Sequence, residues 1–373
     1  MKKILLGTTA VIALGTMTTE AFAAEKIKLG LGGFMRHYVG LSNNDEVAST
    51  SSGAARDKDI SQFSNTEIYF TGNTTLDNGL KVAARVEMEA DGAVSKNIDR
   101  SWLSVSSDAM GTFSIGHMPH FGGDNAVRVP NAGNFDWTDT ADSWNSVATV
   151  STTSSSAFAS AAHGLDFVAW GGDAVKLKYA SPSFSGVTVG ASYSAAQAAD
   201  GSNARRVAGT ASDGYSYGVG YSGDVSGVAV SASLARGALA NKNRETTHFG
   251  LNVGMAGFTV GGGYADFNER RSNVGTNESQ DGSAWELGVA YETGPYAVSA
   301  AYMSDKKKGL TATAGDDKDT KWNIAATYDM GAGVALTADY YHAKADPEGA
   351  GTTIATGKST SVSGLIAGIE VGF

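Results

Sequence analysis

The 373-residue chain contains no cysteine, and positive charge is scarce. Without thiols the protein has no disulfides and no thiolate chemistry, so it cannot rely on the cross-links that many small secreted folds use. Lysine and arginine total 28 against 38 acidic residues, which gives a formal net charge of −10. Phosphate binding needs clustered positive charge, so nucleic acid is not expected as a partner.

Beyond the N-terminus there is also no apolar run long enough to form a transmembrane helix. This absence does not exclude a membrane protein. A closed β-barrel satisfies its backbone hydrogen bonds between strands and is the other structure that can span lipid.

The N-terminus has the composition of a secretory signal peptide over residues 1–23. Lys2 and Lys3 precede an apolar stretch at residues 4–14, and Ala21-Phe22-Ala23 fits a cleavage site. The apolar stretch is too short for a membrane anchor. Cleavage after Ala23 leaves residues 24–373 as one domain, with no internal boundary evident.

Apolar and polar residues alternate along the rest of the chain. In LKVAARVEMEA (residues 80–90), apolar residues occupy the even positions, and all the charges occupy odd ones. The final stretch, GLIAGIEVGF, places Glu370 opposite a face formed by Leu365, Ala367, Ile369, Val371 and Phe373. A period of two predicts strands with one apolar and one polar face.

Turn signals alternate in length between these strands. Short glycine-containing turns alternate with longer polar stretches rich in serine, threonine, asparagine and aspartate. Seven short turns and eight longer loops join sixteen predicted strands. The predicted strands are 26–40, 63–76, 80–90, 97–108, 111–118, 173–181, 187–195, 213–222, 228–236, 245–254, 258–267, 283–292, 296–304, 319–329, 334–343 and 359–373.

An even number of alternating strands with short turns at one end and long loops at the other predicts an all-β, transmembrane antiparallel β-barrel of sixteen strands. A soluble β-sandwich would also alternate. It would not sort its connections by length, nor place aromatic residues at the ends of apolar faces, as Trp285 with Tyr291 and Trp322 with Tyr328 do. Sixteen strands enclose a lumen too wide for side chains to fill, so the lumen is expected to hold water.

The sequence resembles the Gram-negative general-diffusion porins, the sixteen-stranded trimeric type. The resemblance rests on the signal peptide, KIKLGLGGFMRHYVG (26–40), ARVEMEAD (84–91), RSWLSVSSDAMGTFSIGH (100–117) and the terminal Phe373. It implies a homotrimer in the bacterial outer membrane, reached through the periplasm. It also implies a long third loop, from Met118 to about residue 163, folded into the lumen. Phe373 would be read by the barrel-assembly machinery.

The resemblance further implies a channel constriction with basic side chains on the wall and carboxylates on the inward loop. The opposed charges would create a transverse field that favours polar solutes. Many relatives have arginine where this chain has His117. The candidate wall residues are Arg36, Lys81, Arg85, Arg100 and His117, and the candidate loop carboxylates are Asp124, Asp136, Asp139 and Asp142.

The expected function is passive diffusion of ions and small hydrophilic solutes, with cation preference favoured by the acidic composition. A solute-specific channel with Trp137 and Trp144 as a stacking track is an alternative. A barrel-type outer-membrane hydrolase is another, although no motif pairs any of the six histidines with a serine or aspartate. A structural or adhesin barrel is a fourth.

No cofactor or metal is expected, since the acidic loops lack a complete set of calcium ligands at the required spacing. Outer-membrane lipid and lipopolysaccharide are the expected surroundings.

Overall fold

A computed structural model of the chain describes residues 26–44, 58–91, 98–133, 174–196, 212–239, 244–269, 281–308, 316–346 and 360–373. The predicted signal peptide, residues 1–23, lies outside these ranges. Among the described residues, no helix is long and apolar enough to cross a membrane.

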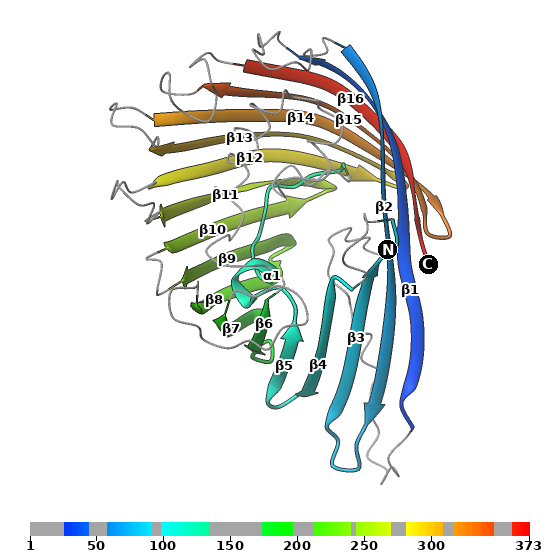
Figure 1. The fold of residues 1–373 in the computed structure, drawn as a ribbon, viewed down its shortest axis with the longest axis vertical. Helices are drawn as coiled ribbons and strands as arrows, with labels where there is room; N and C mark the ends of the chain where they lie inside the picture. Colours follow the sequence, from blue (N-terminus) through cyan, green and yellow to red (C-terminus); the bar gives the residue numbers. More distant parts are fainter. Residues whose placement is uncertain are drawn as a thin grey trace.

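The described residues form sixteen antiparallel strands in one closed barrel, with one short helix, α1 (Phe121–Asp124), inside it (Figure 1). Each of the sixteen predicted strands is present. Their bounds are β1 Lys28–Asn44, β2 Lys58–Thr75, β3 Lys81–Glu89, β4 Arg100–Ser107, β5 Gly111–His117, β6 Val175–Ala180, β7 Val187–Ala196, β8 Ser212–Val225, β9 Val228–Leu239, β10 Arg244–Met255, β11 Phe258–Glu269, β12 Gly282–Thr293, β13 Tyr296–Lys308, β14 Asp316–Gly331, β15 Val334–Asp346 and β16 Thr360–Gly372.

The barrel closes where the first strand pairs with the last. Arg36 of β1 lies opposite Glu370 of β16, and the register continues from Phe34 to Asn44. Beyond the ladder, Gly33 N donates to Phe373 O at 2.9 Å and Phe373 N donates to Gly33 O at 3.1 Å. The terminal residue therefore completes the ring of backbone hydrogen bonds and leaves the described sheet with no open edge.

Side chains alternate between a covered inner face and an open outer face. On β12, Ala284 and Glu286 are 0% and 3% exposed, whereas Trp285 and Leu287 between and after them are 44% and 58% exposed. The exposed positions are apolar and would be costly to leave in water across a whole barrel. In an outer-membrane barrel they form the lipid-facing surface.

Aromatic residues on the outer face gather in two rows. Near the ends of the strands that lead to the long loops, Trp285 packs on Tyr302 at 5.2 Å and Trp322 on Tyr340 at 5.6 Å between ring centroids. Near the short turns, the corresponding pairs are Phe258 with Tyr291 at 4.4 Å and Tyr296 with Tyr328 at 5.0 Å. Two such rows are typical of aromatic girdles at the two membrane interfaces.

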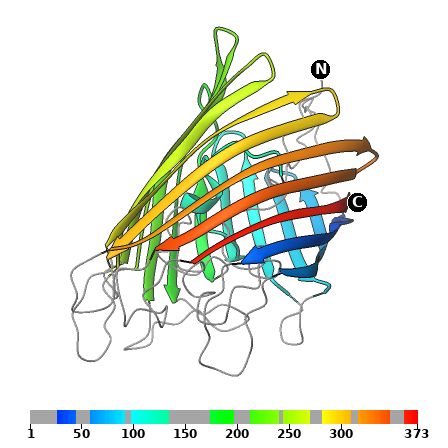
Figure 2. The ribbon, with the colours of Figure 1, turned by 90° about the horizontal axis from the view of Figure 1, so that it is seen from above.

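The short turns lie at one end of the barrel, together with the N-terminal end of β1 and the C-terminus (Figure 2). Several turns depend on glycine in the left-handed region, for example Gly257 at φ 86° and Gly333 at φ 81°. Such residues give hairpins a sharp reversal that side chains with a Cβ disfavour. The opposite ends of the strands lead into the longer connections, as the sequence predicted.

Several strands extend farther toward the long-loop end than predicted. Residues 305–318 were expected to be loop, but β13 continues to Lys308 and β14 begins at Asp316. A 2.7 Å ion pair joins Lys306 to Asp316 across these strands. Opposite charges on facing strands stabilise strand pairing where there is no apolar face. A search for alternating apolar residues therefore does not detect these strand ends. Similarly, only residues 240–243 separate β9 from β10, so that connection is shorter than predicted.

The wall is lowest at β3 to β6, which contain nine, eight, seven and six residues, whereas β8 to β16 contain twelve to sixteen. Figure 1 shows these short strands together on one side of the barrel.

Placing a charge at the centre of the lipid-facing surface should destabilise the barrel. Leu287→Arg is expected to cost about 2–4 kcal/mol of folding free energy in bilayers, because the guanidinium must sit near the membrane midplane. Thr293→Arg, on the same outward face at the short-turn end of the same strand, is the control and should cost no more than about 1 kcal/mol. Folding titrations in lipid vesicles measure both. Equal costs at the two positions would contradict the lipid-facing assignment.

Candidate pore-lining site

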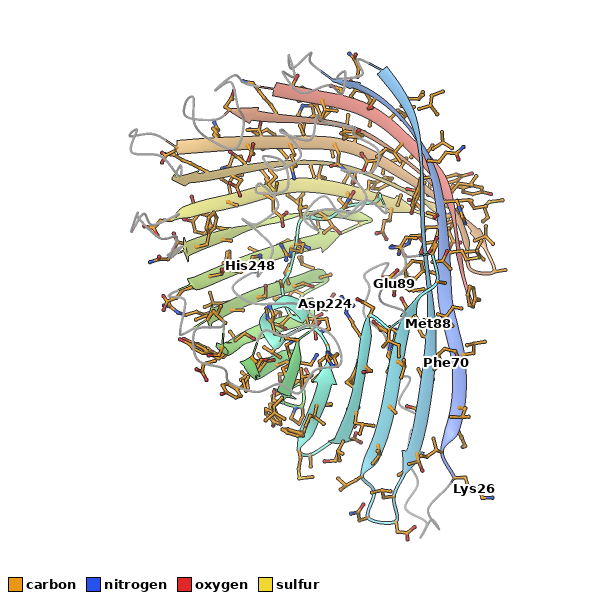
Figure 3. All side chains as sticks on the ribbon, in the orientation of Figure 1. Lys26, Phe70, Met88, Glu89, Asp224 and His248 are labelled. Atoms are coloured by element: carbon orange, nitrogen blue, oxygen red, sulfur yellow. The ribbon has the colours of Figure 1, made fainter. Side chains whose placement is uncertain are left out.

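The inner face of β3 carries the densest group of charges on the described wall. Its inward positions are Lys81, Ala83, Arg85, Glu87 and Glu89, alternating with apolar residues that face outward. Glu89 on this wall and His248 on β10 lie on opposite sides of the barrel interior (Figure 3). The strand pattern that predicted inward charges therefore holds for β3.

Arg85 is held by three contacts. Its Nε donates to Glu87 Oε1 at 2.6 Å, and its Cζ lies 4.2 Å from the ring centre of Tyr69 and 5.7 Å from that of Trp102. Tyr69 comes from β2 and Trp102 from β4, so the guanidinium is flanked from both neighbouring strands. Planar stacking on aromatic rings is a mode available to arginine but not to lysine.

Glu87 joins two of the predicted basic residues into one cluster. Arg100 Nη1 lies 3.5 Å from Glu87 Oε2, and Arg100 Nε lies 3.5 Å from Asp99. The Glu87 side chain is only 6% exposed. A nearly buried carboxylate between two guanidiniums is stabilised by both and fixes their spacing.

Arg36 forms a separate ion pair on the inner face of β1. Its Nε lies 3.1 Å from Glu370 Oε2, and its Cζ lies 4.1 Å from the ring centre of Phe34. The Phe34 ring packs edge-on against Tyr69 at 6.2 Å. An aromatic row thus links the two arginines along the wall from β1 to β4.

The remaining predicted basic residues lie apart from this cluster. Lys81 begins β3 and pairs with Asp108 of a short turn at 3.0 Å, about 13 Å along the strand from Arg85. His117 ends β5 on the same alternation as the exposed Phe113 and Ile115. Its place on the basic wall stays a prediction.

A segment at residues 118–133, here called the inner strap, runs from the end of β5 along the inner face of the barrel. Hydroxyl groups from inward serines of β7, β8, β9 and β13 accept hydrogen bonds from its backbone. These bonds join Phe121 N to Ser192 Oγ (2.7 Å), Gly122 N to Ser216 Oγ (3.3 Å), Val127 N to Ser233 Oγ (2.8 Å) and Ala132 N to Ser299 Oγ (2.8 Å).

Two other wall groups hold the inner strap. Val129 N donates to Glu286 Oε1 at 2.7 Å, and Asn252 Nδ2 donates to Arg128 O at 2.9 Å. At the start of the strap, the buried Lys176 Nζ donates to Met118 O. These contacts satisfy polar groups that would otherwise be buried without partners.

Glycines on the inner wall make room for the inner strap. A Cβ at Gly250 would lie 1.9 Å from Val127 O, and one at Gly190 would lie 2.3 Å from the Phe121 ring. Gly220 and Gly288 are equally close to Asn125 and Val129, at 2.3 and 2.5 Å. These four inward glycines form a shallow trough across β7, β8, β10 and β12.

Of the predicted loop carboxylates, Asp124 belongs to the inner strap, where it ends α1 and forms an ion pair with Lys178 of β6. Asp136, Asp139 and Asp142 lie outside the described residues, as do Trp137 and Trp144. The fold of the rest of the third loop, and its carboxylates, therefore stay predictions.

The sequence patterns did not predict the aromatic partners of the arginines or the residues that hold the inner strap. Phe34, Tyr69 and Trp102 occupy inward positions, where alternation favours polar residues. One sequence feature does indicate their inward placement: each lies two positions from a charged residue on the same strand. The pairs are Phe34 with Arg36, Tyr69 with Glu67, and Trp102 with Arg100. The inward serines and glycines gave no distinguishing pattern.

The structure does bring one histidine to a serine. His342 Nδ1 lies 2.8 Å from Ser363 Oγ on the outer face, and the His342 ring stacks on Trp322 at 5.8 Å. A nucleophile–base pair needs a third group to orient the base. Among the described residues, no carboxylate bonds the second nitrogen of His342, so this pair lacks the arrangement of a hydrolase.

A sequence model of the Gram-negative porin family matches residues 8–348. Among solved structures, the chain is similar to an anion-selective porin from Comamonas acidovorans, with 16% identity, a TM-score of 0.58, and coverage of 93% of this chain and 100% of that one. It is also similar to the trimer form of OmpT, an outer-membrane protein of Vibrio cholerae, with 13% identity, a TM-score of 0.56 and coverage of 94% and 100%.

A porin mutant of Rhodopseudomonas blastica matches with 16% identity, a TM-score of 0.52 and coverage of 93% and 100%. At these identities the structural matches establish the fold. Among curated protein sequences, none matches this chain significantly.

Filling the glycine trough should displace the inner strap. Gly250→Ala places a methyl group against the Val127 carbonyl, which is backbone and must move, so it should lower the free energy of unfolding by about 1–3 kcal/mol. Gly254→Ala, on the same strand and face, is the control, since its Cβ would lie 3.2 Å from the Thr259 side chain. Urea unfolding in detergent measures both variants. An equal loss in both would argue against the trough.

Proposed function

The chain belongs to the Gram-negative porin family and is an outer-membrane β-barrel. On that premise we propose that it forms a water-filled channel for passive diffusion of ions and small hydrophilic solutes, narrowed by the third loop. The observation that carries this proposal is the inner strap. It is tied along the wall facing β1 to β4, across the lumen from the arginine cluster around Arg85.

In this proposal a solute crosses when it fits between the arginine cluster and the third loop while remaining hydrated. The wall contributes fixed charges and hydrogen-bonding groups, so a polar solute exchanges part of its water for wall contacts. An apolar solute of equal size cannot form hydrogen bonds or ionic contacts with the wall, so it is not favoured. No chemical step is required of any residue.

The charges around Arg85 on β1 to β4 favour cations over anions. Each of the inner-wall arginines, Arg36, Arg85 and Arg100, already pairs with a carboxylate. Glu67 and Glu89 face each other across β2 and β3 beside this cluster. Carboxylates therefore outnumber arginines in this part of the wall. The name of the Comamonas porin describes that protein as anion-selective, so the two are expected to differ in ion preference.

Assembly follows the same premise. The first 23 residues would direct export and be removed, and Phe373 would be read by the barrel-assembly machinery. We further propose a homotrimer, which is supported by the trimer form of the similar Vibrio cholerae protein. The low wall of β3 to β6 offers an outer surface for such contacts, and lipid and lipopolysaccharide would surround the remainder.

The solute-specific channel remains the second candidate, because the aromatic row of Phe34, Tyr69 and Trp102 gives the inner wall a stacking surface that general diffusion does not need. Saturation of transport by one solute class distinguishes it from unspecific diffusion.

Reconstituted protein should conduct ions through planar bilayers. We expect stepwise conductance increases in potassium chloride, with three sublevels closing in turn if the channel is a trimer. Membranes that remain non-conducting at high protein loading, with folding verified by circular dichroism, would argue for a structural or adhesin barrel.

Arg85→Ser should raise the cation preference. The substitution removes one positive charge from the wall and leaves Glu87 with one guanidinium partner fewer, so the local potential becomes more negative. Reversal potentials in a salt gradient measure the change, and Arg236→Ser is a matched control. Arg236 pairs with Glu245 on the outer face of β9 and β10. An unchanged reversal potential in Arg85→Ser would show that Arg85 does not line the constriction.

A further inference from the structure

Arg85 has a hydrogen-bonding edge that the wall does not use. Its only hydrogen bond within the described residues goes from Nε to Glu87, and its side chain is 19% exposed. The terminal nitrogens, Nη1 and Nη2, are not among the buried polar atoms without partners. They therefore present two donors to the lumen in the planar geometry that matches a carboxylate.

The orientation of this edge is fixed before any solute arrives. Tyr69 and Trp102 flank the guanidinium from the two neighbouring strands, and Glu87 holds its Nε. Glu87 is itself held by Arg100. A donor pair that is already oriented loses little conformational entropy on binding, which raises affinity for a ligand of matching shape.

Carboxylates lie one row farther along the same wall. The register of β2 and β3 places Thr71 opposite Arg85, Tyr69 opposite Glu87, and Glu67 opposite Glu89. Inward rows are roughly 7 Å apart, and the Arg85 side chain reaches the row of Tyr69 and Glu87. The guanidinium edge and the Glu67–Glu89 row are therefore separated by about one row.

This arrangement selects against simple anions. Glu67, Glu87, Glu89 and Asp99 outnumber the two arginines of the cluster, so a phosphate or a free carboxylate entering it meets net repulsion. A molecule that carries an ammonium group beside its carboxylate meets attraction at both ends. Its carboxylate matches the Arg85 edge, and its ammonium matches the Glu67–Glu89 row.

From this geometry we infer that the wall of β2 to β4 contains a binding subsite for small zwitterions of the amino-acid type, with Arg85 as the carboxylate receptor. The inference rests on the proposed channel function and deepens it by naming a preferred solute class. Binding is weak and reversible, so it gives saturable transport and leaves the channel open to ions.

Liposome swelling with four three-carbon solutes tests the subsite. L-alanine carries both charges, propionate only the carboxylate, isopropylamine only the ammonium, and lactamide neither. With the wild-type protein, the initial rate for L-alanine should saturate with concentration, and the rates for the other three should rise linearly.

Arg85→Lys separates the shape of the guanidinium from its charge. Lysine keeps the positive charge but lacks the planar pair of donors, so the half-saturation concentration for L-alanine should rise about tenfold or more. Stepwise potassium chloride conductance, recorded in parallel, shows that the variant folds and inserts as a channel. Glu67→Gln should also raise the half-saturation concentration for L-alanine. Arg236→Gln, on the outer face, is the matched control and should behave as wild type.

The outcomes separate the two proposals. Absence of potassium chloride conductance in the wild-type protein would overturn the channel itself. Normal conductance with linear L-alanine rates would overturn only the subsite. Saturation that persists in Arg85→Lys, or that propionate shows equally, would also overturn it.

Discussion

The structure depends on one requirement, that every backbone donor and acceptor crossing the membrane finds a partner within the protein. A sheet meets this requirement in lipid only when its first and last strands pair. Here β1 and β16 close the ring, and the reciprocal hydrogen bonds of Gly33 and Phe373 extend the pairing to the last residue. The two termini of the described barrel therefore meet at the short-turn end, and neither β1 nor β16 is left as an exposed edge.

Closure divides every strand between two environments. The outward positions are apolar across the membrane and aromatic at its borders, whereas the inward positions are free to vary because they do not face lipid. The inward side chains therefore differ between opposite walls of the barrel. Serines and glycines of β7 to β13 receive the inner strap, while β1 to β4 carry arginines stacked on aromatic rings. The asymmetry of the lumen follows from which inward side chains each wall supplies.

The strands and their alternation were predictable because lipid imposes the same period on all sixteen of them. The inward placement of Arg36, Arg85 and Arg100 followed from that period. Their partners did not follow, since Tyr69 and Trp102 reach Arg85 from adjacent strands through a register that only the folded barrel defines. Strand ends were misjudged where cross-strand charges, rather than an apolar face, extend the pairing. The contacts between the inner strap and the barrel wall join residues more than fifty positions apart, and no local pattern reveals them.

The absence of cysteine allows the division between lipid and lumen to be measured without interference from native thiols. Single cysteines placed at successive positions of β12 (Gly282–Thr293), labelled with a nitroxide after reconstitution, report contact with dissolved oxygen, which concentrates in the lipid. The closed barrel predicts oxygen accessibility that alternates with a period of two, with maxima at positions 285, 287 and 289. Uniform accessibility, or a period near that of a helix, would contradict a barrel closed in lipid.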